Sequence, residues 1–161
     1  MNRHILVDAD ACPVKDEIYR VGARLGVPVT VVANSGFRVP RDRLPDGTPL
    51  VTPVIVSGDF DAADDWIAER AEELCLAGVR TVVVTSDIPL ADRAIKAGAV
   101  ALKPTGAEWD GANIGAALAT RNVMQDLRAG LEGQSLGGPA PFSKADRSRF
   151  LQALDRVLQR R

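Results

Sequence analysis

Short runs of β-branched residues alternate with helix-length segments over the first two thirds of this chain, and this alternation strongly constrains its fold. The run Arg80–Thr85, which contains three consecutive valines, is typical of a strand buried on both faces of a parallel sheet. The predicted strands are His4–Val7, Pro28–Ala33, Leu50–Val56, Arg80–Thr85 and Ala99–Leu102. The predicted helices between them are Pro13–Leu25, Asp61–Ala77 and Pro89–Ala97. Strands separated by helices predict an α/β fold with three layers, α/β/α, around a mostly parallel five-stranded sheet.

The last third of the chain departs from this alternation. Its expected elements are a helix over Asn113–Ala129, a Gly- and Pro-rich loop over Gly130–Pro141 and a helix over Lys144–Arg161. Ser143 precedes the last helix and Asp146 follows three residues later, which is the spacing of a capping box. We therefore predict one domain over residues 1–161, with a core over residues 1–112 and a C-terminal helical extension over residues 113–161.

Composition and charge narrow the class of protein. The net charge is −1, so any contact with nucleic acid has to come from a local basic patch. Neither Cys12 nor Cys75 belongs to a Cys-x-x-Cys pair, which favours a reducing compartment. Cys12 lies near a predicted helix N-terminus, a position that lowers the pKa of a thiol, but with no second cysteine or suitable histidine expected nearby we prefer a packing role. The chain shows no signal-like start and no apolar run long enough to span a bilayer, so we expect a cytoplasmic protein without a membrane partner.

Aspartates follow two of the predicted strands. Asp8 comes directly after Ile-Leu-Val and Asp10 two residues later, while Asp87 comes after Val-Val-Val-Thr-Ser. Because ligands of open α/β sheets bind beyond the carboxyl ends of the strands, these side chains are expected at the functional edge. Aspartates before helices also serve as caps, but the cluster as a whole favours a functional site over that interpretation.

The helix predicted over Asp61–Ala77 adds a fourth carboxylate. Its apolar stripe includes Ile67, and Asp64 lies on the same stripe near the N-terminal end. A carboxylate that faces the interior needs a partner or a metal ion. Asp65 is rotated by about 100° from Asp64 and is expected in solvent, whereas Asp61 is interpreted as a helix cap.

Carboxylates gathered at one edge of a sheet repel each other unless a cation lies between them. Mg²⁺ and Mn²⁺ prefer such oxygen ligands, and either ion activates water and stabilises charge on a phosphoryl group. We therefore predict a catalytic Mg²⁺ or Mn²⁺ site formed by Asp8, Asp10, Asp64 and Asp87. The chain's one histidine, His4, lies at the start of a strand and is not expected to act as the base.

Several motifs together resemble the YaiI/YqxD family of bacterial proteins. They are Val7-Asp8-Ala9-Asp10-Ala11-Cys12-Pro13, Val32-Ala33-Asn34, Asp61-Ala62-Ala63-Asp64, Thr85-Ser86-Asp87-Ile88-Pro89-Leu90-Ala91 and Gly137-Gly138-Pro139. The resemblance runs essentially end to end and implies no established activity. That family is in turn similar to PIN and NYN nuclease-like domains, whose acidic positions match Asp8, Asp64 and Asp87 here, with Asp10 at a less regular position. This similarity implies a PIN-like fold and metal-dependent phosphodiester hydrolysis, with RNA favoured as the substrate.

Basic residues near the predicted site are candidates for contacting nucleic-acid phosphates. Arg38, Arg41 and Arg43 belong to the long loop predicted over Asn34–Pro49, which is expected at the functional edge. Lys103 follows the last predicted strand and is expected to reach the same edge. A solvated loop explains the arginines equally well, since neighbouring aspartates partly cancel their charge.

Two other functions also fit the sequence. An Asp-x-Asp after the first strand suits a phosphatase of the haloacid-dehalogenase type, with Asp8 as nucleophile and Thr85 or Ser86 binding the phosphate. That family needs a later lysine and an acidic pair, and Lys103 is a poor match for the first of these. A non-catalytic adaptor for nucleic acid or protein would keep the fold without the chemistry.

Overall fold

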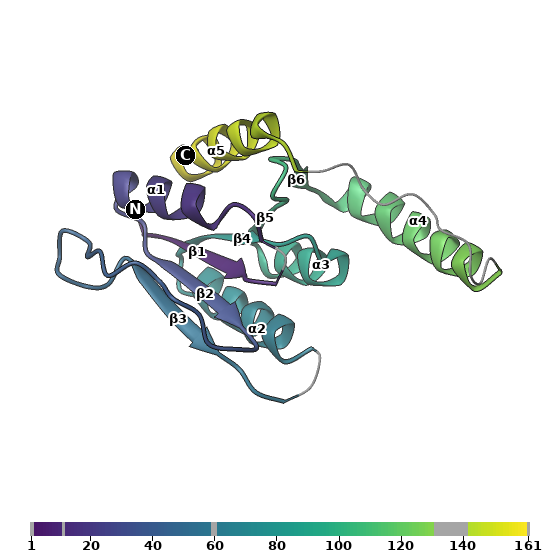
Figure 1. Ribbon diagram of the computed structural model, residues 1–161, viewed down its shortest axis with the longest axis horizontal. Coiled ribbons are helices and arrows are strands. Elements are labelled where there is room, and N and C mark those ends of the chain that lie inside the picture. Colours follow the sequence, from purple (N-terminus) through teal and green to yellow (C-terminus); the bar gives the residue numbers. More distant parts are fainter. Residues whose placement is uncertain (1, 11, 59–60, 131–141, 161) are drawn as a thin grey trace.

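A six-stranded sheet forms the centre of the computed structural model, which describes residues 2–10, 12–58, 61–130 and 142–160 (Figure 1). Its strands are β1 (Arg3–Asp8), β2 (Val29–Ala33), β3 (Val51–Ile55), β4 (Arg80–Val84), β5 (Val100–Leu102) and β6 (Glu108–Trp109). The helices are α1 (Lys15–Leu25), α2 (Ala62–Leu76), α3 (Ile88–Ala97), α4 (Gly111–Gly130) and α5 (Lys144–Gln159). The strand order is β3-β2-β1-β4-β5-β6, and β1 to β5 are parallel.

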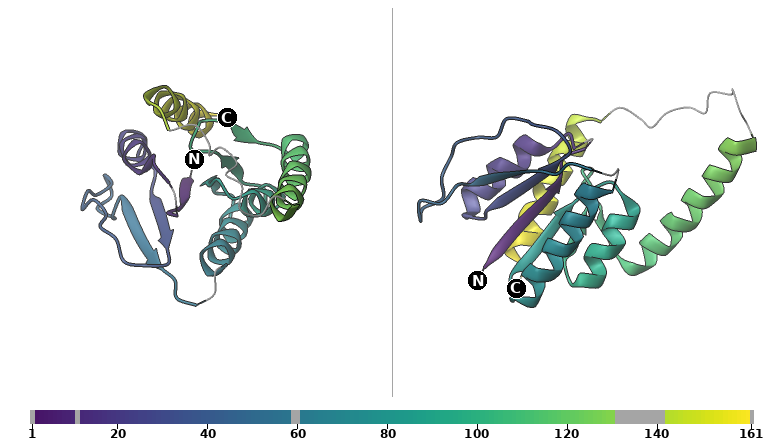
Figure 2. Two further views of the ribbon diagram at one scale, coloured as in Figure 1. Left: turned by 45° about the vertical axis from the view of Figure 1, so that its right-hand side comes forward. Right: turned by 90° about the horizontal axis from the view of Figure 1, so that it is seen from below.

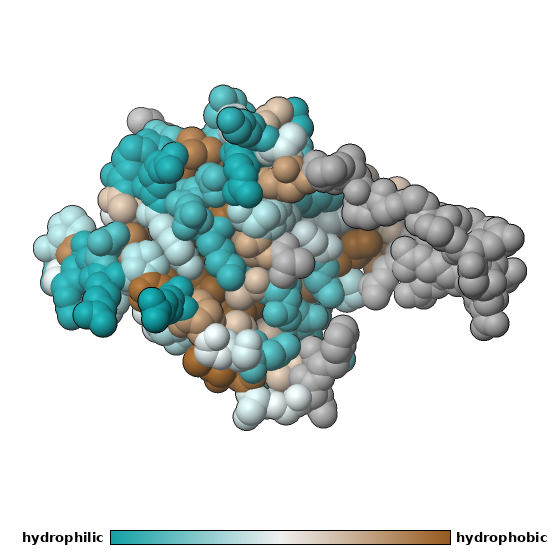
Figure 3. Space-filling model, in the orientation of Figure 1, coloured by the Kyte–Doolittle hydropathy of each residue, from teal (hydrophilic) through white to brown (hydrophobic). Residues whose placement is uncertain are grey.

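The predicted three-layer, mostly parallel fold is confirmed, but the sheet has six strands in the described residues rather than five. The additional strand, β6, pairs antiparallel with β5 and has only two residues, too few to show a periodicity in the sequence. β3 forms the opposite edge, where Pro53 is tolerated because its missing N–H is not needed by a further strand. Figure 3 shows apolar surface over the end of β3, and Ile55 there is exposed.

Helices cover both faces of the sheet (Figure 1, Figure 2). α1 and α5 lie on one face, and α2, α3 and the start of α4 lie on the other. The first face is filled by a cluster that includes Ile5, Val7 and Phe150, and the second by one that includes Leu6 and Ile67. Successive residues of β1 therefore alternate between two cores, because side chains along a strand point to opposite faces of the sheet.

The two C-terminal helices pack differently. α4 buries Ile114 in the α2–α3 core, and its later turns extend away from the sheet (Figure 1, Figure 2). α5 instead inserts Phe150, which is fully buried, into the core under α1. Arg3 on β1 donates to the carbonyls of Leu25 and Leu158, 3.0 Å each, and so ties the ends of α1 and α5 together. The loop predicted over Gly130–Pro141, between α4 and α5, lies outside the described residues except for Gly130, which ends α4.

Candidate functional site

Asp8 ends β1 at the carboxyl edge of the sheet and is only 8% exposed. Its Oδ2 accepts a hydrogen bond from the Thr85 hydroxyl at 3.0 Å, and its Oδ1 accepts one from the Asp10 backbone N–H at 3.4 Å. Burial raises the pKa of the Asp8 carboxyl, the two hydrogen bonds oppose that rise, and the carboxylates of Asp10 and Asp87 add to it. The fold thus holds this carboxyl in place while making its ionisation unfavourable.

Thr85 links Asp8 to Asp87. It is 2% exposed and directly follows β4, the strand paired with β1. Its Oγ1 donates to Asp8 and accepts from the Asp87 backbone N–H at 2.9 Å. Asp87 in turn caps α3, because its Oδ1 accepts from the Leu90 N–H at 2.9 Å. Sequence reasoning missed this positioning role of Thr85, although a threonine that directly continues a buried valine run was the available signal.

Asp64 lies in the first turn of α2 and is half-buried. Burial raises the pKa of its carboxyl to about 6, and the carboxylates of Asp87 and Asp8 are the next largest causes. Asp64 therefore lies on the same side of the sheet as the two strand-end aspartates, near enough for their charges to act on its carboxyl group. Asp65 is exposed and forms an ion pair at 2.7 Å with an arginine of α3. Asp61 occupies the N-cap position of α2, but its side chain makes no capping hydrogen bond.

Asp10 lies just beyond β1 and is exposed, with its Oδ2 accepting from the Asn34 side-chain amide at 3.5 Å. In the described part of the chain, no three Asp, Glu, His or Cys side chains stand close enough together to form a ready metal-binding group. The donor set still fits Mg²⁺ or Mn²⁺ chemically, because such ions take carboxylate oxygens and are often held by one or two carboxylates plus water. A cation would stabilise the ionised forms of Asp8 and Asp64, whose pKa values are raised without one.

The loop between β2 and β3 separates the candidate phosphate-binding arginines. Arg38 follows a phenylalanine whose ring lies 5.6 Å from the Lys15 ammonium, and Lys15 starts α1 at the carboxyl edge. Arg43 instead forms an isolated β-bridge with Pro49, shortly before β3 begins. Parallel neighbours require a connection that crosses the sheet from one edge to the other, so Arg43 lies at the amino edge. Arg43 thus lies away from the aspartates, and Arg41, which is exposed, lies two residues earlier in the same loop; the phosphate contacts expected of both remain predictions.

Lys103 follows β5 at the carboxyl edge, where it was expected. Its ammonium lies 3.9 Å from the centroid of the Trp109 ring, which is a cation–π contact. Trp109 is 6% exposed, and its indole N–H donates to the Thr85 carbonyl at 3.5 Å. In this arrangement Lys103 covers the Trp109 ring, whose N–H contacts the residue that follows β4.

Cys12 and His4 also have shifted pKa values. Burial raises the pKa of the Cys12 thiol, which opposes the lowering expected near a helix N-terminus and agrees with packing against the core. Burial lowers the pKa of His4 to about 4, and Arg70 acts in the same direction. His4 hydrogen-bonds the Thr30 hydroxyl at 2.8 Å near the amino end of β1, so it is a neutral group away from the aspartates.

Comparison with known proteins gives this arrangement a family. The model of the family described as "Uncharacterized BCR, YaiI/YqxD family" matches residues 6–160. The chain belongs to the YaiI/YqxD family. A UPF0178 protein of Sphingopyxis alaskensis is 59% identical over 156 residues, which are 97% of this chain and 93% of that protein. UPF0178 proteins of Rhodopseudomonas palustris and Brucella ovis are 52% and 51% identical over 97% of this chain, and the matches cover 92% and 89% of those proteins.

The YaiI/YqxD match spans the strand ends that carry the aspartates and also α5. The C-terminal helix is thus included in the family pattern together with the sheet. The names of these YaiI/YqxD relatives state no activity, so a function for this chain has to be argued from its own chemistry. Within the described residues, no helix combines the length and the apolar character that crossing a membrane requires.

Proposed function

We propose that this YaiI/YqxD protein hydrolyses phosphodiester bonds in nucleic acid with Mg²⁺ or Mn²⁺ as cofactor, and that RNA is its favoured substrate. The observation that carries the proposal is that Asp8, Asp64 and Asp87 lie at one edge of the sheet, near enough for their charges to raise the pKa values of Asp8 and Asp64 further above the effect of burial. Carboxyl groups that repel each other at the ligand-binding edge of an α/β sheet favour a cation site over a purely structural role.

A divalent cation at this edge would neutralise charge on the scissile phosphate and lower the pKa of water. Asp8 is the firmest candidate ligand, because hydrogen bonds orient both of its oxygens and each oxygen keeps a lone pair for a cation. Asp87 engages its Oδ1 in capping α3, so its Oδ2 is the atom available to an ion. Asp10, exposed at the mouth of the site, is an auxiliary ligand.

Asp64 is the group best suited to handle a proton. Its pKa is about 6 without a cation and would be lower with one bound, so at neutral pH its carboxylate is ionised and able to accept a proton. In the proposed reaction Asp64 would accept the proton of the attacking water while the phosphorus–oxygen bond to the leaving strand breaks. Asp8 and Asp87 would hold the cation. The three groups come from separate elements, because Asp64 lies in the first turn of α2, Asp8 ends β1 and Asp87 caps α3.

The choice of substrate rests on the resemblance to PIN and NYN nuclease-like domains. Asp8, Asp64 and Asp87 match the acidic positions of those domains, and here they occupy the ends of two neighbouring strands and the first turn of a helix. This correspondence supports phosphodiester hydrolysis, and RNA in particular, over other reactions at a divalent-cation site.

The geometry gives less support to a phosphatase with Asp8 as nucleophile. The Thr85 hydroxyl, which would bind the phosphate, is buried and already bridges Asp8 and the Asp87 N–H. The Lys103 ammonium lies over the Trp109 ring rather than being held by the carboxylates. We therefore favour a reaction in which water, and not Asp8, attacks the phosphorus.

Cleavage of a labelled single-stranded RNA by the purified protein with Mn²⁺ or Mg²⁺ tests the proposal. We expect activity that EDTA abolishes and that Asp8→Asn and Asp87→Asn each reduce to background. Asp64→Asn, which removes the proposed base, should also reduce activity to background. Its matched control is Asp65→Asn, because the adjacent Asp65 carboxylate pairs with an arginine of α3 and should not affect activity. RNA binding that is insensitive to chelator, without cleavage under either ion, would contradict the proposal and support the adaptor alternative.

A further inference from the structure

A groove runs between α5 and the turn that joins β5 to β6. The turn approaches α5 closely at Gly106, where an added Cβ would lie 2.8 Å from the carbonyl carbon and oxygen of Arg149. Gly106 also has a φ of +94°, a conformation that side chains disfavour. Both facts require glycine at position 106, so the backbone of the turn lies directly against the backbone of α5 at Arg149.

The lining of this groove is basic. We call it the α5 groove. It has a volume of about 460 Å³, and its lining residues are Thr105, Gly106, Ala107, Arg149, Gln152 and Arg156. Among these described lining residues there are two guanidinium groups, one amide and one hydroxyl, and there is no carboxylate. Such a set of donors fits an anion, and arginine forks match phosphate oxygens in particular.

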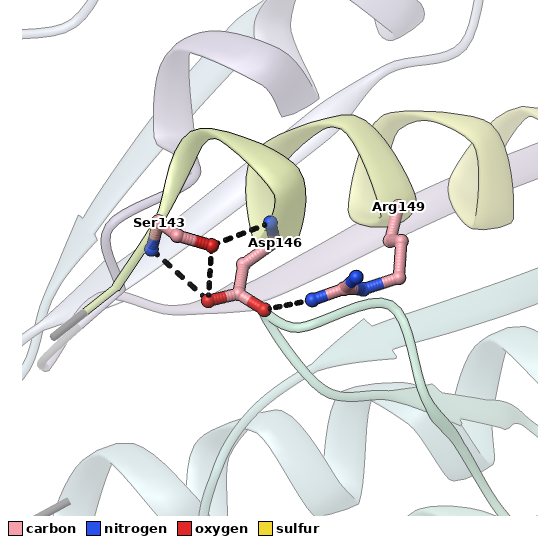
Figure 4. Close-up of polar contacts among 3 residues, drawn as sticks. All are labelled: Ser143, Asp146 and Arg149. Carbon is pink, nitrogen blue, oxygen red and sulfur yellow. Dashed lines mark hydrogen bonds and ion pairs between the residues drawn. The ribbon is translucent and has the colours of Figure 1, made fainter. Parts of the chain in front are cut away.

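Neighbouring acids orient the arginines without filling the groove. Asp146 accepts from the Ser143 backbone N–H through one oxygen and pairs with Arg149 through the other (Figure 4). One contact leaves further guanidinium N–H groups of Arg149 for a ligand. Glu108, the acid near Arg156, is held by two nitrogens of Arg160 at 3.0 and 2.9 Å.

The spacing of the arginines suits a chain of phosphates. Arg149 and Arg156 are seven residues apart on α5 and both are exposed on one side of the helix, with Gln152 between them. Seven residues correspond to about 10.5 Å of helix, which exceeds the size of a single phosphate. Successive phosphates of a strand can therefore contact the two guanidinium groups separately.

The α5 groove starts at the edge of the sheet that carries the aspartates and runs along α5 toward the opposite edge, where Arg80 at the start of β4 donates to the carbonyl of the residue after Arg156. β5 is parallel to β4 and β1, so the turn that follows β5 lies at the same edge as Asp8. α5 also begins at this edge, because Arg147 donates to the Pro13 carbonyl at 2.5 Å, just after β1 ends. A strand cleaved at the aspartates can therefore continue onto a basic groove that starts at the same edge of the sheet.

We propose that the α5 groove binds the phosphate backbone of a single-stranded nucleic acid through Arg149 and Arg156, and that this strand is the substrate of the aspartate site. The second part rests on the proposed function. The contacts are to phosphates, so the groove should bind RNA and DNA strands of similar length with similar affinity.

Fluorescence anisotropy with a labelled oligouridylate of about a dozen nucleotides measures this binding, in EDTA so that no turnover occurs. The test variant is Arg149→Gln with Arg156→Gln. Losing two phosphate contacts should make the negative slope of log association constant against log salt concentration shallower by about 1.4. It should also weaken binding about 25-fold near 0.1 M salt. The control is Arg70→Gln with Lys96→Gln, which removes the same charge from α2 and α3 on the opposite face of the sheet.

The outcomes separate this proposal from the proposed function. Reduced affinity and slope in the test variant, with an unchanged control and an equal effect on oligothymidylate, support the α5 groove even if no RNA is ever cleaved. The groove proposal would be overturned by an equal loss of affinity in the test and control variants, by an unchanged affinity in the test variant, or by no strand binding in the wild type. Loss of cleavage but not of binding in Asp8→Asn assigns hydrolysis to the aspartates independently.

Discussion

Replacing Asp64 with asparagine is predicted to stabilise the folded protein at neutral pH. Folding raises the pKa of Asp64 from 3.8 to about 6, so the stability that its protonated form confers is complete below pH 3.8 and is lost as the pH rises through 6. A shift of this size corresponds to at most about 3 kcal/mol. Because the side chain is only half-buried, solvent screening reduces the expected cost of the charged form to about 1 kcal/mol.

Asp64→Asn removes that cost, so the melting temperature at pH 7 should rise by roughly 2–4 °C for a chain of this size. The gain should disappear below about pH 4, where the wild-type carboxyl is protonated in both states. Thermal unfolding followed by circular dichroism in EDTA measures both quantities. Asp65→Asn loses the same interaction with the α2 dipole, but Asp65 lies apart from Asp8, Asp64 and Asp87. This variant should therefore not raise the melting temperature. A destabilised Asp64→Asn at pH 7, or an equal gain at pH 4, would refute the idea that crowded carboxylates oppose folding.

Three other changes test separate parts of the structure. Thr85→Val removes the hydroxyl that donates to Asp8 and should lower the free energy of unfolding by about 1–3 kcal/mol in urea titrations; an unchanged value would argue against the bridge. Gly106→Ala places a methyl group 2.8 Å from the α5 backbone and should cost about 1–3 kcal/mol, whereas Gly111→Ala, with no atom within 4 Å, is the control expected to be neutral. The pKa of His4 falls from 6.5 to about 4 on folding, so the folded protein loses stability as the pH drops from 6.5 to 4. His4→Gln should remove up to about 3 kcal/mol of this loss. Identical profiles of unfolding free energy against pH in the wild type and the variant would contradict this prediction.

Local signals explain why most of the fold could be predicted. The valine run of β4 is buried on both faces, and such strands have a strong signature wherever they occur. Gly26 and Gly98 end α1 and α3 with φ values of 69° and 101°, so the helix boundaries are also local properties. β6 could not be predicted, because two residues gain their strand conformation only by pairing with β5.

In the candidate site, too, some features follow from a single segment and others depend on contacts between segments. Asp8 and Asp87 follow strands, and Asp64 follows from the phase of one helix, so each could be placed from its own segment. The role of Thr85 depends on the register between β1 and β4, which no single segment contains. The position of Arg43 depends on the path of a loop that crosses the sheet, and nothing in the loop's composition shows that path.

The central claim is that the carboxyl edge of the sheet binds a divalent cation. Crystals soaked in Mn²⁺ and measured for anomalous scattering test it most directly. We predict an anomalous peak about 2.1 Å from an oxygen of Asp8, between Asp8 and Asp87, in the wild type, and no such peak in Asp8→Asn. A wild-type map without a peak there, or a peak that persists unchanged in Asp8→Asn, would contradict the account.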